Sequence, residues 1–137
     1  GRYPVEAVKA MVRVCLGAEQ EPGTTKSQHR LGESFTRCDE TIALSAMYAA
    51  NHFHGIKAIV SLTESGHTPL IMSRIRSGVP IYCYTSHRSM NREQIGASAV
   101  AALVESGQLN TGEWVIITRG DTNLDGGTNT LRIVCAE

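Results

Sequence analysis

The hydroxyl-rich turn Thr63-Glu-Ser-Gly-His-Thr68 is the segment of this sequence best suited to hold a charged ligand. It joins the end of an apolar run to the start of an expected helix, and layered α/β proteins bind their ligands at that edge of the sheet. The unpaired N–H groups of a helix N-terminus attract anions, and serine and threonine hydroxyls add uncharged donors. The spacing therefore predicts a phosphate-binding turn, in which Gly66 lets the backbone approach closely. The alternative is a turn that only caps its own helix.

The second candidate is the polar, glycine-rich stretch from Arg119 to Thr130, which lies between two expected strands. Connections of this length are usually functional or disordered. If the strand before it runs parallel to the strand before residue 63, the stretch starts at the same sheet edge and can fold over a bound ligand, with Gly126 and Gly127 as joints. The alternative is an exposed surface hairpin.

Helices and strands alternate along the chain and must position both segments. Apolar residues at helical spacing predict helices over 4–16, 39–54, 70–77 and 91–106. Short apolar runs predict strands over 57–62, 81–85, 114–118 and 131–135. Thr68 is expected to cap the third helix, with Pro69 in its first turn and Gly78 at its end. This alternation predicts a layered α/β sheet.

Composition and charge exclude several classes of partner. The chain has 137 residues, of which 42 % are hydrophobic and 19 % charged, as expected of one folded domain. Its 13 basic and 13 acidic residues cancel, so we expect no nucleic acid partner and no membrane anchor. The sequence contains no nucleophile elbow, no lysine-containing phosphate loop and no dinucleotide fingerprint, and we expect no signal peptide. Glu64 and Asp121 are expected to be solvated loop acids.

The cysteines and histidines suggest neither disulfides nor a metal site. Cys15, Cys38, Cys83 and Cys135 form no C-x-x-C pair, and three of them lie in apolar runs. We therefore expect reduced thiols, packed as small hydrophobic residues, in a cytoplasmic protein. His52 and His54 form the one close histidine pair, and no neighbouring residue is spaced to complete a zinc site with them.

Four long motifs resemble the C-terminal part of bacterial pyruvate kinases, in the same order and over nearly the whole chain. They are Gly1-Arg-Tyr-Pro-Val-Glu-Ala-Val, Glu40-Thr-Ile-Ala-Leu-Ser-Ala-Met-Tyr-Ala-Ala-Asn51, Ile59-Val-Ser-Leu-Thr-Glu-Ser-Gly-His-Thr68 with Ser73-Arg-Ile75, and Gly127-Thr-Asn-Thr-Leu-Arg-Ile133. The resemblance implies a three-layer α/β/α sandwich with a mixed, mainly parallel sheet whose last strand is antiparallel. It also implies that residues 1–18 are the remnant of the last helix of a catalytic barrel and that residues 19–137 form the allosteric domain.

The resemblance also assigns roles to both candidate segments. The effector phosphate-binding loop of the family falls on Thr63, Glu64, Ser65, Gly66, His67 and Thr68. The effector loop falls on residues 120–130, and includes Gly120, Asp121, Asp125, Gly126, Gly127 and Thr128. The implied activator is a phosphorylated sugar or a nucleotide monophosphate. Because two carboxylates near a second phosphate would repel it, Asp121 and Asp125 favour a monophosphate.

Further implications concern catalysis and assembly. In the family, phosphoenolpyruvate, ADP, Mg²⁺ and K⁺ bind in a barrel that precedes this segment, so we expect no cofactor and no turnover in this chain alone. Self-association into a tetramer through these domains is implied. Relatives place a helix and an edge strand between the 81–85 strand and the next helix, where this chain has only residues 86–90.

A second resemblance points to a different class of protein. The pattern T-x-S-G-x-T after a strand is also similar to the phosphate loop of flavodoxins, which are FMN-binding electron carriers. Aromatic residues make up only 5 % of the chain, and none flanks residues 63–68 to stack on a flavin. The sequence therefore favours the regulatory domain.

Overall fold

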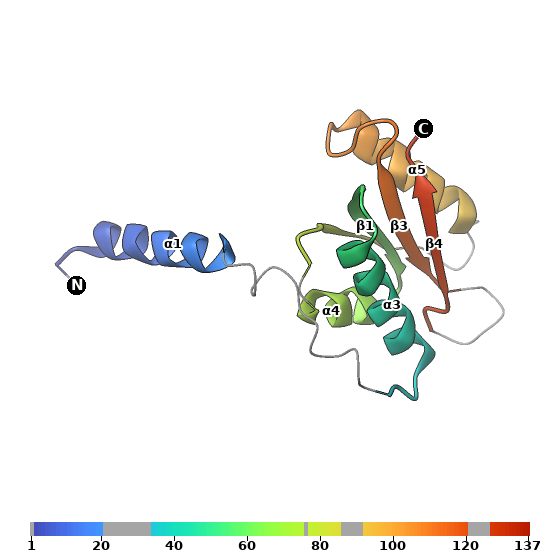
Figure 1. Ribbon diagram of the computed structural model, residues 1–137, viewed down its shortest axis with the longest axis horizontal. Coiled ribbons are helices and arrows are strands. Elements are labelled where there is room, and N and C mark those ends of the chain that lie inside the picture. The colour runs from blue at the N-terminus through green and yellow to red at the C-terminus, as the bar shows by residue number, and fades with distance from the viewer. Residues whose placement is uncertain (1, 21–33, 76, 86–91, 121–126) are drawn as a thin grey trace.

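The computed structural model describes residues 2–20, 34–75, 77–85, 92–120 and 127–137. Figure 1 shows the arrangement of their helices and strands. The elements in chain order are α1 (Pro4–Gln20), α3 (Cys38–His52), β1 (Ile56–Thr63), α4 (His67–Arg74), β2 (Ile81–Thr85), α5 (Arg92–Glu105), β3 (Trp114–Arg119) and β4 (Thr130–Cys135).

The four strands form one mixed sheet in the order β2-β1-β3-β4. The central strand β1 runs parallel to both of its neighbours, and Ile59 is in register with Ile81 on one side and Ile116 on the other. The last strand, β4, runs antiparallel to β3. The predicted mixed sheet with an antiparallel last strand is confirmed.

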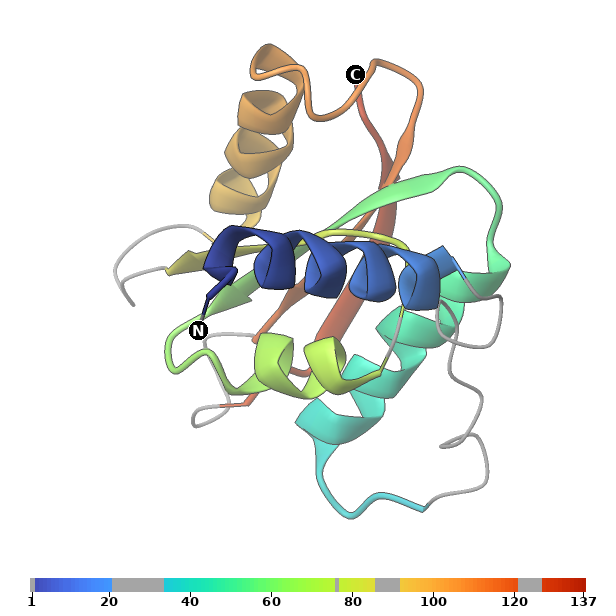
Figure 2. The same ribbon diagram turned by 90° about the vertical axis from the view of Figure 1, so that its left-hand side faces the viewer.

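Helices cover both faces of this sheet, α3 and α4 on one side and α5 on the other (Figures 1 and 2). Alternate residues of β1 point to opposite faces. Ile59 packs in the core with α3 and α4, whereas Ala58 and Val60 pack in the core with α5. Because both faces of β1 are covered, seven of its eight residues are buried. This arrangement confirms the three-layer α/β/α fold.

Helix α1 contributes no buried residue and projects away from the sheet (Figure 1). Its apolar residues, among them Val8, Met11 and Leu16, are at least half exposed. The helix continues through Gly17 to Gln20, so the predicted end at residue 16 is wrong. A single glycine costs a helix only about 1 kcal/mol, which does not by itself end it. The assignment of residues 1–18 to a separate unit stays a prediction.

The boundaries of α4 also differ from the prediction. Gly66, not Thr68, occupies the N-cap position, and Thr68 lies inside the helix with its hydroxyl engaged elsewhere. Pro69 lies in the first turn, as predicted. The helix ends at Arg74, before Gly78, because Ile75 adopts an extended conformation and is buried in the core.

The prediction that cysteines pack in the interior is wrong, because all four are exposed. Cys15 lies on α1, Cys38 begins α3, and Cys83 and Cys135 lie on the two edge strands of the sheet. All four thiols are free. An apolar run on an edge strand or on an unpacked helix does not bury its residues.

In the part of the chain that the structure describes, no helix is long and apolar enough to cross a membrane.

Candidate functional site

The turn at residues 63–68 joins the buried strand β1 to the N-terminus of α4. Gly66 has a φ of 76°, in the left-handed region that favours glycine. Its N–H donates to Thr63 Oγ1 at 2.9 Å, and the His67 N–H meets Ser65 Oγ at 3.4 Å. No other atom lies within 4 Å of the position that a Cβ of residue 66 would occupy. The turn therefore caps itself, as the alternative interpretation proposed, and also leaves open space above its backbone.

The N-terminus of α4 carries no acidic residue in its first turn. The N-terminus of α3, by contrast, begins with Asp39 and Glu40, which compensate its positive end. Ser65 and His67 are exposed, so solvent reaches the start of α4. Of the two helix N-termini on this face, that of α4 is the one suited to an external anion.

The second candidate segment begins and ends beside this turn. Because β3 runs parallel to β1, Arg119 at the end of β3 and Thr63 at the end of β1 lie at the same edge of the sheet. The hydroxyls of Thr68 and Thr128 are 2.7 Å apart in a buried hydrogen bond. The structure thus brings the two predicted segments into contact. Gly120 and Gly127 are half-buried, whereas Asp121, Asp125 and Gly126 lie outside the described residues.

Buried polar side chains gather at this end of the sheet. Thr118 donates to Ser61 Oγ at 3.1 Å, and neither residue is exposed. Within the described ranges, the buried polar residues are Asp39, Ser61, Thr63, Thr68, Thr118 and Thr128. Ser61 and Thr63 lie on β1, Thr118 lies on β3, and Thr68 lies in the first turn of α4. Ser61 and Thr118 could not be identified from the sequence, because hydroxyls within apolar runs do not stand out by pattern.

An ion pair borders the turn on the α3 side. The Arg37 guanidinium donates to both Asp39 oxygens, with Nε to Oδ1 at 3.0 Å and Nη2 to Oδ2 at 2.7 Å. These hydrogen bonds hold the pKa of Asp39 below its usual range, although partial burial of the carboxylate opposes them. His67 Nε2 lies 3.7 Å from the same carboxylate. No sequence pattern indicated this contact between Asp39 and α4.

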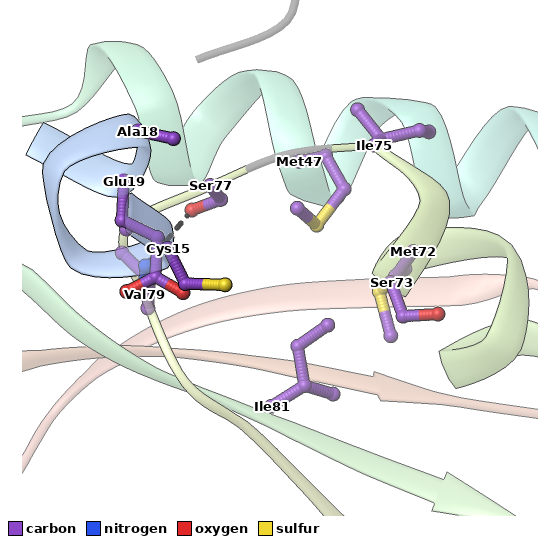
Figure 3. Close-up of a pocket in the computed structure, with 11 residues that line it drawn as sticks. Cys15, Ala18, Glu19, Met47, Met72, Ser73, Ile75, Ser77, Val79 and Ile81 are labelled. Carbon is purple, nitrogen blue, oxygen red and sulfur yellow. Dashed lines mark hydrogen bonds between the residues drawn. The ribbon is translucent and has the colours of Figure 1, made fainter. Parts of the chain in front are cut away.

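A separate pocket of about 790 Å³ lies between the end of α1 and the core (Figure 3). Its walls include Met47, Met72 and Ile81, which are apolar, and Glu19 of α1. The pocket borders the second half of α4, away from the turn at its N-terminus. An anionic ligand would meet the Glu19 carboxylate there without a basic lining residue to offset it. This pocket is therefore not the phosphate site that the sequence predicts.

The described residues hold no group of three histidine, cysteine or acidic side chains that would suit a metal ion. His52 packs on its own helix, with its ring stacked 4.1 Å from that of Tyr48 and Nδ1 2.8 Å from the Tyr48 carbonyl oxygen.

The fold and the turn define a three-layer α/β domain of the class that places ligand sites at the carboxyl edge of parallel strands. Residues 40–95 match the family described as "Pyruvate kinase, alpha/beta domain". The whole chain is 43 % identical to pyruvate kinase II of Salmonella typhimurium and covers 33 % of it. Pyruvate kinase of Buchnera aphidicola subsp. Baizongia pistaciae is 44 % identical over 98 % of this chain and 32 % of its own length. The chain belongs to the pyruvate kinase family and corresponds to its C-terminal α/β domain.

A solved structure supports the same assignment. The fold matches Cryptosporidium parvum pyruvate kinase in complex with ADP with a TM-score of 0.73 and 25 % identity, over 98 % of this chain and 31 % of that one. The chain spans about a third of the length of the relatives it matches. The alignment with the Salmonella protein has 157 positions, 20 more than the 137 residues here. This difference agrees with the expectation that relatives contain a segment that is absent from this chain.

Proposed function

We propose that this chain is the regulatory domain of a pyruvate kinase and binds a phosphorylated effector at residues 63–68. The observation that carries the proposal is the start of α4. There an open, left-handed Gly66 precedes a helix N-terminus without acidic residues, and Ser65 and His67 lie exposed beside it. The positive end of the α4 dipole and the hydroxyls beside it suit a phosphate dianion.

The contact between Thr68 and Thr128 supports a role for residues 120–130 in covering the ligand. The bond joins the first turn of α4 to the residues that lead directly into β4. A ligand on the turn would therefore act on both segments at once. The acids Asp121 and Asp125 favour a monophosphorylated sugar or a nucleotide monophosphate over a bisphosphate.

The whole protein is proposed to transfer a phosphoryl group between phosphoenolpyruvate and ADP. Its Mg²⁺ and K⁺ would bind outside this segment, and the segment alone would have no turnover. Subunit contacts through the edge strand β4 are the proposed route from effector binding to regulation. They become allosteric only if the effector binds two subunit arrangements unequally. The comparisons give no support to the FMN-binding alternative.

A thermal-shift panel on this chain tests the proposal, with ribose 5-phosphate, glucose 6-phosphate, AMP and fructose bisphosphate as ligands. A ligand present at about 100 times its Kd stabilises the folded state by about 2.7 kcal/mol, so a true effector raises Tm measurably. Hydrogen exchange then locates the site. Protection of residues 63–68 together with 127–136 is expected. No shift with any phosphate, or protection confined to residues 77–81 at the separate pocket, would overturn the assignment.

A further inference from the structure

The strand β2 forms the edge of the sheet opposite β4, and half of its backbone groups face outward. The Ile59 N–H of β1 donates to the Pro80 carbonyl at 2.9 Å, so residue 80 points its backbone oxygen toward β1. Backbone groups of successive strand residues point to opposite sides. Ile81, Cys83 and Thr85 therefore direct their N–H and C=O groups away from β1, toward the free edge.

Within its described span, β2 lacks the charges and prolines that usually prevent strand pairing. Proteins protect edge strands with charged residues, prolines or bulges. Strand β4 carries Arg132 within its span, whereas β2 (Ile81–Thr85, sequence IYCYT) contains neither a charge nor a proline. Cys83 and Thr85 are exposed. The end of α1 approaches only the start of the strand, where Ile81 lines the pocket of Figure 3 and the next four residues do not.

The sequence of β2 is self-complementary about Cys83. In an antiparallel pair of two copies with a two-fold axis at Cys83, that residue lies opposite its own copy and Tyr82 lies opposite Tyr84 of the other chain. Ile81 then lies opposite Thr85, so all three outward-facing residues fall in hydrogen-bonded pairs. Isologous contacts require this kind of symmetry.

We propose that β2 pairs with β2 of a second copy of this chain, which extends the sheet across a two-fold axis. The tyrosines are the side chains that stabilise this pairing. Both are half-buried against the core on the α5 side, and Tyr82 Oη donates to Gln108 Oε1 at 3.1 Å. Their rings are thereby held in position to form cross-strand aromatic pairs with the partner copy. This contact is independent of the effector site and uses the opposite edge of the sheet from β4.

Sedimentation velocity over a concentration series, under reducing conditions, tests the contact with two variants of one residue. Cys83→Pro removes an N–H that faces outward, so it leaves the bonds between β1 and β2 intact and blocks the new ladder. It is expected to weaken self-association at least about tenfold. Cys83→Thr keeps the N–H and a strand-forming side chain and should associate like wild type. Equal association of the two variants would overturn the proposal, as would a wild-type chain that stays monomeric throughout.

Disulfide trapping gives a second measurement that does not depend on how well the proline variant folds. In a chain with Cys15→Ser, Cys38→Ser and Cys135→Ser, oxidised glutathione should link two copies through Cys83. Opposed Cα atoms of such a pair lie about 5.5 Å apart, within the range of a disulfide. The control adds Cys83→Ser and Thr85→Cys, which separates the two thiols by about 13 Å along the strands. Equal cross-linking of the two chains would overturn the proposed register. If self-association persists in Cys83→Pro but is lost when β4 is altered, the copies pair through β4, and the proposal for β2 is overturned.

Discussion

The tripeptide Glu-Ser-Gly occurs twice in this chain, at residues 64–66 and 105–107, in opposite relations to a helix. The first copy precedes α4 and the second follows α5. Both glycines are left-handed, with φ of 76° at Gly66 and 71° at Gly107. A Cβ at either position would meet no atom within 4 Å. The two copies thus have the same residue types and nearly the same backbone conformation at glycine. They differ in the end of the helix that they adjoin.

The copy at the end of α5 satisfies its own backbone. Gln108 N–H donates to the Leu103 carbonyl at 2.9 Å and Gly107 N–H to the Val104 carbonyl at 3.0 Å, which is a Schellman cap. What remains there is the negative end of a helix dipole. The copy at α4 also caps itself, through Thr63 Oγ1 and Ser65 Oγ, but it lies at the positive end of a helix dipole. If the α4 copy binds a ligand as proposed, the short motif takes that property from the direction of the adjoining helix, not from its own residues.

The largest expected effect comes from placing a carboxylate in each copy. Ser65→Asp should abolish binding of a phosphorylated effector, because the new charge lies where the phosphate would sit. Ser106→Asp should leave binding unchanged and cost about 0.3–1 kcal/mol of stability at the negative end of α5. Isothermal titration calorimetry with the effector found in the thermal-shift panel, and urea unfolding, give the two readouts. If Ser65→Asp binds the effector with wild-type affinity, the phosphate does not bind at this turn.

Alanine at the two glycines separates backbone strain from ligand contact. Gly66→Ala and Gly107→Ala should each lower the free energy of unfolding by about 1–2 kcal/mol, since both impose a left-handed conformation on an L-residue. Only Gly66→Ala should also weaken effector binding, by about tenfold or more, because its methyl group would enter the space above the turn. If both variants bind equally well, the ligand does not approach residue 66.

The elements of the fold could be predicted from the sequence because burial and periodicity coincide in them. The run from Lys57 to Leu62 falls within a strand covered on both faces, and residues 81–85 form the strand that was predicted. The turn at 63–68 was singled out because hydroxyl residues and a glycine join an apolar run to an expected helix, and its role in ligand binding stays a prediction. The burial of Cys83 and Cys135 was predicted wrongly. Both lie in apolar runs, but these runs form the edge strands of the sheet, where the cysteine side chains stay exposed.

The rest of the candidate site depends on contacts between distant parts of the chain. Thr68 and Thr128 are 60 residues apart, and Thr118 and Ser61 are 57 apart. No local pattern indicates that one hydroxyl will find another at such separation. The contact of His67 with Asp39 likewise requires that α3 and α4 pack side by side. Pairing of this kind follows from the topology of the sheet and not from sequence spacing.

A smaller effect is expected from removing single hydroxyls. Thr68→Val keeps the shape of the side chain and leaves the buried Thr128 hydroxyl without its partner, at a cost of about 1–2 kcal/mol. Ser106→Ala removes a bond to the Leu103 carbonyl at the surface and should cost only about 0.5 kcal/mol. Urea unfolding measures both. Equal costs would show that the hydrogen bond between Thr68 and Thr128 stabilises the fold no more than a local hydrogen bond does.

The smallest effect concerns Asp39, which gives the N-terminus of α3 the anion that α4 lacks. Because hydrogen bonds from Arg37 lower the pKa of Asp39 in the folded state, folding favours the ionised carboxylate. Its stabilisation is fully present above the unfolded pKa of about 3.9 and is lost as pH falls through the lower folded value. Asp39→Asn should therefore cost about 0.5–1 kcal/mol at pH 7, a value kept small by the exposure of Arg37.

Urea unfolding of wild type and Asp39→Asn from pH 7 to pH 2.5 measures this difference directly. The gap between the two chains should be constant above about pH 5 and should narrow below about pH 4, as wild type alone takes up the proton. Glu40→Gln is the matched control, since it removes a neighbouring charge from the same helix start without breaking the pair with Arg37. A gap that stays constant down to pH 2.5 would mean that the Asp39 carboxylate does not compensate the positive end of α3. The proposed contrast, between a helix N-terminus that supplies its own anion and one expected to bind a ligand, would then not hold for α3.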